Sequence, residues 1–164
     1  MSSLQERLAA APQTIKFGAS EHMSKLFESD AQRFARNLDE AIAYHRRARL
    51  FRQDGMRVSL VFNVASIAIE CYLIALCAYF RDMPFNHSYG NLVDDVERLM
   101  SFPPLLAQRI RALDKIFGIC SLDDYHHGVA EESDALDALD LCDALQSLIQ
   151  GLGPMPKALA KPDV

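Results

Sequence analysis

Apolar residues recur every three or four positions along most of the chain, which is the spacing of amphipathic helices. The pattern predicts helices over about residues 29–53, 56–81, 89–101, 104–117 and 132–151. Ser29 or Asp30 is a good N-cap for the first of these, and Gly55 can close it. A capping-box pattern at the start of the chain adds a short helix over about 3–11, followed by a connecting arm to residue 28.

Two of these helices show a clear apolar stripe that should face a core. In the first helix the stripe comprises Phe34, Leu38, Ala41, Ile42, Ala48 and Phe51. In the last helix it comprises Leu136, Leu139, Cys142, Leu145, Leu148, Ile149 and Leu152. Short connections between such helices predict an all-α fold, an up-and-down bundle of four or five helices.

The stretch from Val58 to Phe80 is apolar almost throughout and is long enough to cross a bilayer. Asn63 and Glu70 interrupt it, however, and a carboxylate in the middle of a membrane is unfavourable. A helix surrounded by other helices has the same composition. We therefore expect a buried central helix and no membrane span, in a domain over 29–152 with an arm (1–28) before it and a flexible tail (153–164) after it.

The net charge of −5 is unevenly distributed. Residues 1–81 contain 11 basic and 8 acidic residues, whereas residues 82–164 contain 6 basic and 14 acidic residues. This balance argues against a dedicated DNA-binding protein, which needs a basic face. The four cysteines lack metal-binding or redox spacing, and the N-terminus lacks the apolar core of a signal peptide, so we expect free buried thiols and a cytoplasmic protein.

The order of helices and several local patterns resemble the HEPN domain, a helical module of nucleotide-binding proteins. The central helix, Ala65–Leu76 with Glu70 inside it, is similar to the alanine-rich helix of that family. The run Pro84–Leu92 is similar to the family's proline, histidine and leucines at the entry to its third helix. Tyr125 falls where the family has an aromatic residue, and Ser133–Leu139 is similar to its closing helix.

The chain also departs from the family pattern. Ile74 stands where a lysine is usual, and the residues after Tyr125 do not match the family's arginine-tyrosine-proline. The resemblance implies a homodimer, a nucleotide or RNA ligand, and a nucleotidyltransferase partner in a toxin–antitoxin pair. We expect no cofactor.

HEPN proteins that cleave RNA use an arginine followed, after four to six residues, by a histidine. Arg81 and His87 have five residues between them, so they are the candidate catalytic pair. A shuffled chain with this many Arg and His residues would be expected to contain such a pair by chance. Pro84 also places the pair across a loop, where His87 could instead cap the third helix.

Other residues are candidates for ligand binding. Glu70 is a carboxylate in an apolar helix and should be bonded to an Arg, a Tyr or a helix end. Tyr125 and His126 lie in a polar loop with Asp123, Asp124 and His127, but their spacing does not favour a metal site.

Arg46, Arg47, Arg49 and Arg52 crowd the end of the first long helix, and they could bind phosphates. Alternatively, they face an acidic stripe on the last helix, which comprises Asp134, Asp137, Asp140 and Asp143.

These observations favour a non-catalytic HEPN-like binding or interaction module. Two alternatives remain open at this point: a metal-independent endoribonuclease toxin, and a scaffold or regulator that binds only protein.

Overall fold

The computed structural model describes residues 28–118 and 126–155, and within these ranges the chain is a bundle of five α-helices. The all-α bundle expected from the sequence is confirmed. The expected helix at 3–11, the arm that follows it and most of the tail lie outside the described residues.

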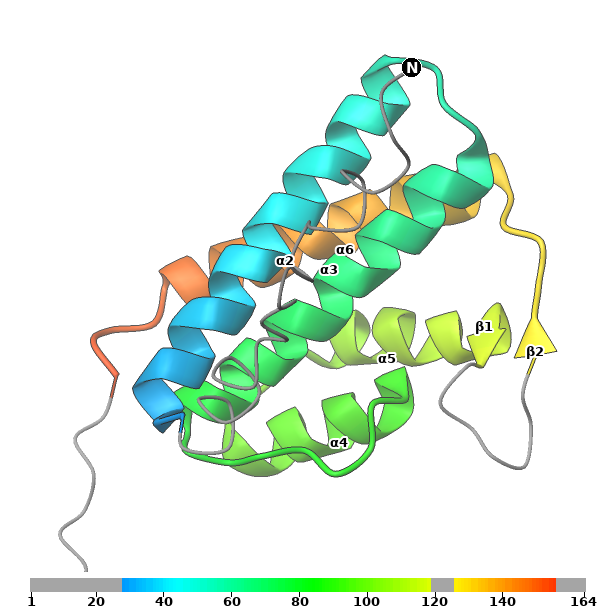
Figure 1. Ribbon diagram of the computed structural model, residues 1–164. Helices are drawn as coiled ribbons and strands as arrows, with labels where there is room; N and C mark the ends of the chain where they lie inside the picture. Colours follow the sequence, from blue (N-terminus) through cyan, green and yellow to red (C-terminus); the bar gives the residue numbers. More distant parts are fainter. Residues whose placement is uncertain (1–27, 119–125, 156–164) are drawn as a thin grey trace, which may run out of the picture.

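The first two described helices form a long antiparallel hairpin (Figure 1). Helix α2 spans Asp30–Gln53, and Ser29 caps it in a capping box with Gln32. Asp54 is the C-cap of the helix, and Gly55 then turns the chain with a φ of 67°, a conformation that suits glycine. Helix α3 spans Val58–Tyr79 and packs along the full length of α2.

Helix α3 is the centre of the fold, because α2, α4 and α6 all pack against it. It is long and apolar enough to cross a membrane, but 72% of its most apolar stretch is buried inside the fold. Its largest fully buried side chains are Phe62, Ile69, Tyr72, Leu73 and Leu76. This burial is what the sequence predicts for a helix with neighbours on several sides.

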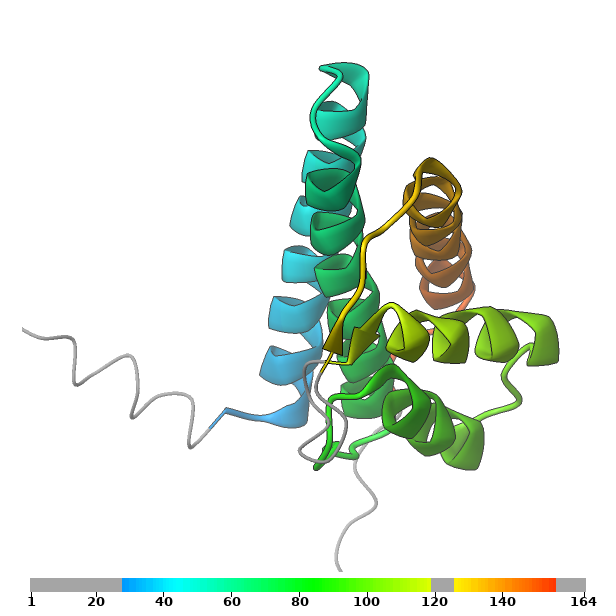
Figure 2. The same cartoon turned by 90° about the vertical axis from the view of Figure 1, so that its right-hand side faces the viewer.

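Two short helices close one end of the bundle. Helix α4 spans Tyr89–Leu99, and helix α5 spans Pro104–Ala112 with a 3₁₀ turn η1 at Leu113–Lys115. Figures 1 and 2 show that α5 runs across the α2–α3 hairpin rather than along it. Only the long hairpin therefore has the simple up-and-down arrangement.

A small hairpin leads into the last helix. Strands β1 (Phe117–Gly118) and β2 (His126–His127) pair antiparallel, and the pattern of the sequence does not predict this element. Helix α6 then spans Glu132–Gln150 and packs against α3. Figure 2 shows α6 beside α3, and α6 also contacts α2.

Two residues assigned to the core stripes are exposed. Ile42 on α2 and Leu136 on α6 are 39% and 45% exposed, whereas their neighbours Ala41 and Ala135 are buried. Both residues sit at the edge of their stripe, and the small alanine beside each one belongs to the buried core cluster. The predicted stripes were therefore about one residue too wide.

Candidate functional site

Glu70 and His87 meet at the surface of the bundle, although no spacing in the sequence connects them. His87 lies in the loop between α3 and α4, and its Nδ1 is 2.8 Å from Oε1 of Glu70 on α3. The side chain of His87 is 46% exposed and that of Glu70 is 30% exposed. Glu70 is therefore only partly buried, and its partner is a histidine rather than the Arg, Tyr or helix end that the sequence suggested. When Nδ1–H donates a hydrogen bond to the carboxylate, Nε2 is the nitrogen of the neutral imidazole that carries no proton.

His87 does not cap helix α4. The hydroxyl of Ser88 accepts the N–H of Asn91, and the carboxylate of Asp114 accepts the N–H groups of Tyr89 and Gly90 at 2.9 and 2.7 Å. Gly90 makes this possible, because a Cβ at that position would lie 3.1 Å from the Asp114 carboxylate. These contacts fix the start of α4 and hence the loop that carries His87.

Arg81 occupies a strained backbone position at the end of α3. Its φ is 63°, in the left-handed region where glycine is usual. The N–H of Arg81 donates to the carbonyl of Ala78, and that of Asp82 donates to the carbonyl of Cys77. This is a Schellman motif with arginine in the place of glycine, and the geometry carries a strain of about 1 kcal/mol.

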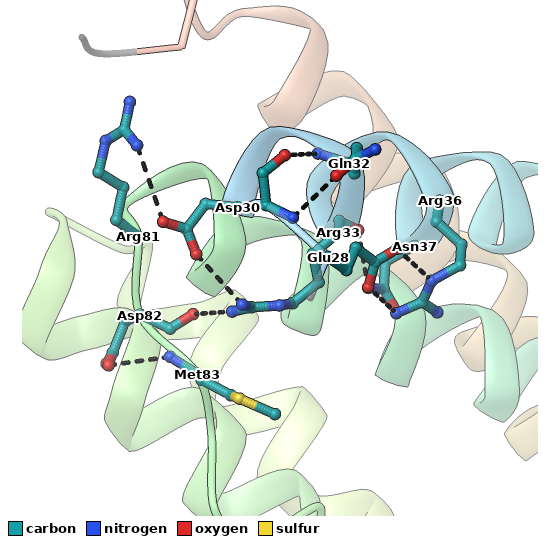
Figure 3. Close-up of polar contacts among 10 residues, drawn as sticks. Glu28, Asp30, Gln32, Arg33, Arg36, Asn37, Arg81, Asp82 and Met83 are labelled. Atoms are coloured by element: carbon teal, nitrogen blue, oxygen red, sulfur yellow. Dashed lines mark hydrogen bonds and ion pairs between the residues drawn. The ribbon is translucent and has the colours of Figure 1, made fainter. Parts of the chain in front are cut away.

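The side chain of Arg81 points to the start of α2. Figure 3 shows its guanidinium beside Asp30, with a distance of 3.7 Å between Nη1 and Oδ2. Arg33 pairs with the other oxygen of Asp30 at 3.2 Å and also donates to the carbonyl of Asp82. Arg81 thus joins the end of α3 to the start of α2, while His87 is held by Glu70 farther back along α3.

Substitution of Arg81 tests the backbone strain at this position. Because glycine adopts a positive φ without penalty, Arg81→Gly is expected to be about 1 kcal/mol more stable than Arg81→Ala. Both variants lose the pair with Asp30, so the comparison isolates the backbone. Urea denaturation of the two variants measures the difference. Equal midpoints would show that the left-handed conformation carries no strain.

The arginine cluster at the end of α2 divides into two pairs. Arg49 pairs with Asp143, and Arg52 pairs with Glu132, both on α6. Arg46 and Arg47 are exposed, and no ion pair joins them to any residue in the part of the chain that the structure describes.

The acidic stripe of α6 is divided as well. Asp143 faces α2, whereas Asp137 and Asp140 pair with Arg109 of α5. Asp134 accepts the N–H of Glu131 and so caps its own helix. The two stripes therefore face each other only in part.

A buried polar cluster joins the three long helices and was not identified from the sequence. His45 of α2 is 4% exposed, and its Nδ1 lies 3.2 Å from the hydroxyl of the fully buried Tyr72 of α3. On its other side, Nε2 accepts a hydrogen bond from Nε of Arg49 at 3.0 Å and lies 3.3 Å from Asp143 of α6. Since Arg49 can only donate, Nε2 carries no proton and Nδ1–H donates to Tyr72.

Burial dominates the electrostatics of this cluster. Desolvation lowers the pKa of His45, and Arg49 lowers it further, while Asp143 raises it. Desolvation also raises the pKa of Tyr72 well above its ordinary value. Both groups are therefore neutral at physiological pH. The cluster is a structural connection between helices, and the spacing of His45 with Ala41 and Ala48 on one helix face was the signal for it in the sequence.

The cysteines in the described ranges are buried and free, as expected: Cys71, Cys77 and Cys142. Burial raises the pKa of the Cys71 and Cys77 thiols to about 12, so they are poor nucleophiles. Among the described residues there is no group of three His, Cys, Asp or Glu side chains that could hold a metal ion. Tyr125 lies outside the described residues, and for His126 the structure describes only the backbone in β2.

Comparison of the chain with family models, with curated proteins and with solved structures gives no match.

Proposed function

We propose that this chain is a non-catalytic HEPN-like binding module that pairs with a nucleotidyltransferase in a toxin–antitoxin-type system. Its proposed small ligand is a nucleotide or RNA. The proposal that the module is non-catalytic is supported by one observation: Arg81 and His87 pair with different residues. Arg81 pairs with Asp30 at the start of α2, and His87 pairs with Glu70 on α3.

RNA cleavage without a metal requires an acid–base group and a cation on the same phosphate. From Glu70 to the end of α3 at Tyr79 the helix rises by about 13 Å, and Arg81 lies beyond that end. The imidazole of His87 is therefore held near Glu70, whereas the guanidinium of Arg81 lies beyond the end of α3. This spacing favours the binding module over the alternative of an endoribonuclease toxin.

The charges on α2 favour weak RNA binding. Arg49 and Arg52 are neutralised by acidic residues of α6, which leaves Arg46 and Arg47 as the cations of the cluster that have no ion pair within the described residues. Affinity for RNA depends on the number of phosphates that cations neutralise, so two arginines support only weak, salt-sensitive binding. A protein partner is accordingly the main proposed contact. If a neighbouring reading frame encodes a nucleotidyltransferase, co-purification of the two proteins tests the pairing.

An RNA cleavage assay tests the non-catalytic proposal. We expect the wild-type protein, Arg81→Ala and His87→Ala to leave a labelled single-stranded RNA intact to the same extent, because neither residue takes part in chemistry. Arg98→Ala is the matched control, since it removes another exposed arginine, one that pairs with Asp82. Cleavage by the wild type that falls about 100-fold or more in both test variants, but not in the control, would establish the endoribonuclease instead.

A further inference from the structure

One long side of α2 faces solvent at the outer edge of the bundle (Figure 1). Most neighbours on it are three or four positions apart, so the residues form a single stripe along the helix. We call this stripe the outer face of α2, and it comprises Ala35, Asp39, Ile42, Ala43, Arg46 and Leu50. Ile42 and Leu50 are large apolar residues that are 39% and 46% exposed.

The two charges on the outer face are not used within the described fold. No ion pair joins Asp39 or Arg46 to any residue of 28–118 or 126–155. The positions one turn from Arg46 hold Ile42, Ala43, Arg49 and Leu50, none of which is acidic. The arginine one turn before Asp39 is Arg36, which pairs with Glu28 and Glu40.

The outer face of α2 is complementary to a second copy of itself that runs antiparallel. Its residues lie at equal distances on either side of the midpoint between Ile42 and Ala43. Asp39 and Arg46 are equidistant from that point, and so are Ala35 and Leu50. An antiparallel copy of the same helix therefore places each acidic residue opposite a basic one and each large apolar residue opposite a small one.

We propose that the outer face of α2 is the surface through which two copies of this chain associate. In this dimer, Asp39 of each copy pairs with Arg46 of the other, on both sides of a two-fold axis. Each contact is then made twice, as in other isologous interfaces. Ile42 and Ala43 form the centre, and the alanines allow the two helix backbones to approach closely.

Charge also selects the direction of pairing. A parallel arrangement in register would place Arg46 against Arg46 and Asp39 against Asp39, which is repulsive. Because exposed ion pairs contribute little affinity, the apolar residues supply most of the attraction, and the charges specify which surfaces meet. The proposed dimer uses residues of α2 only, so it does not depend on which ligand the module binds.

A charge swap tests the proposal. Multi-angle light scattering at micromolar concentration should give the wild type a mass near twice the chain mass of 18.4 kDa. Asp39→Arg and Arg46→Asp, each alone, place like charges opposite each other and should raise the dissociation constant at least about tenfold. The double variant Asp39→Arg/Arg46→Asp restores opposite charges across the axis and should restore the dimer.

Arg57→Glu is the matched control, because Arg57 is an exposed arginine that precedes α3 and lies off the outer face. It should remain dimeric. All substituted residues are exposed, so circular dichroism should show unchanged helix content in every variant. A monomeric wild type, single variants that dimerise as well as the control, or a double variant that stays monomeric would each overturn the proposal.

Discussion

Replacing Tyr72 with alanine is expected to lower the free energy of unfolding by about 3–5 kcal/mol, the range found for large aromatic residues in protein cores. Tyr72 is fully buried in the middle of α3, and its ring is also in edge contact with His45. The substitution opens a cavity where α2, α3 and α6 meet. For a domain whose total stability is about 5–15 kcal/mol, this loss is large.

Tyr72→Phe separates the cavity from the hydrogen bond. The phenylalanine fills the same space but leaves Nδ1–H of His45 without its acceptor, so we expect a smaller loss of about 1–3 kcal/mol. Thermal and urea denaturation of both variants measure the two contributions. If Tyr72→Phe were as stable as the wild type, the hydrogen bond between Tyr72 and His45 would contribute nothing to the stability of the fold.

Acidification is expected to destabilise the protein through His45. The folded state lowers the pKa of this histidine below its ordinary value of 6.5, so the unfolded chain binds its proton first as the pH falls. The contribution of the neutral histidine is therefore fully present above about pH 6.5 and is lost as the pH falls from there toward the lower pKa of the folded state. The slope is at most about 1.4 kcal/mol per pH unit for this one proton.

His45→Gln provides the comparison, because glutamine is neutral at every pH and keeps polar atoms near Tyr72 and Arg49. Urea denaturation of both proteins between neutral pH and about pH 5 should show a shallower decline in the variant. Asp143→Asn should have the opposite effect. Asp143 raises the pKa of His45, so its removal lowers that pKa further, and stability continues to decline to lower pH than in the wild type. Identical pH profiles for wild type and His45→Gln would contradict the assignment.

Helix positions followed from the sequence wherever local chemistry decides them. Ser29 and Gln32 form a capping box from residues three positions apart, and Gly55 supplies the positive φ that ends α2. Such caps involve residues within one turn of each other, so they can be recognised from a short stretch of sequence. The central position of α3 followed from its composition, because only a helix with several neighbours can be apolar nearly all round.

The pairings between distant residues could not be predicted in the same way. Glu70 and His87 are 17 residues apart, and Asp114 reaches Tyr89 across 25 residues. Which of several histidines and carboxylates meet depends on how α3, α4 and η1 cross, and no local pattern records this. Arg81 shows a related limit, since nothing about an arginine indicates that it will adopt the backbone conformation of a glycine.

The small β1–β2 hairpin was missed for a different reason. Each strand has two residues, which is too short to show the alternation of apolar and polar side chains that identifies a strand.

The position of α6 at the far end of the folded domain has a consequence for synthesis on the ribosome. Helix α3 is the most apolar segment of the described chain, and α6 covers one of its sides. About seventy residues separate the end of α3 from the end of α6, so translation completes the cover on the order of ten seconds after α3 has been made. During that interval the nascent chain presents an apolar helix with the composition of a membrane span, and chaperones that hold such segments have time to bind it.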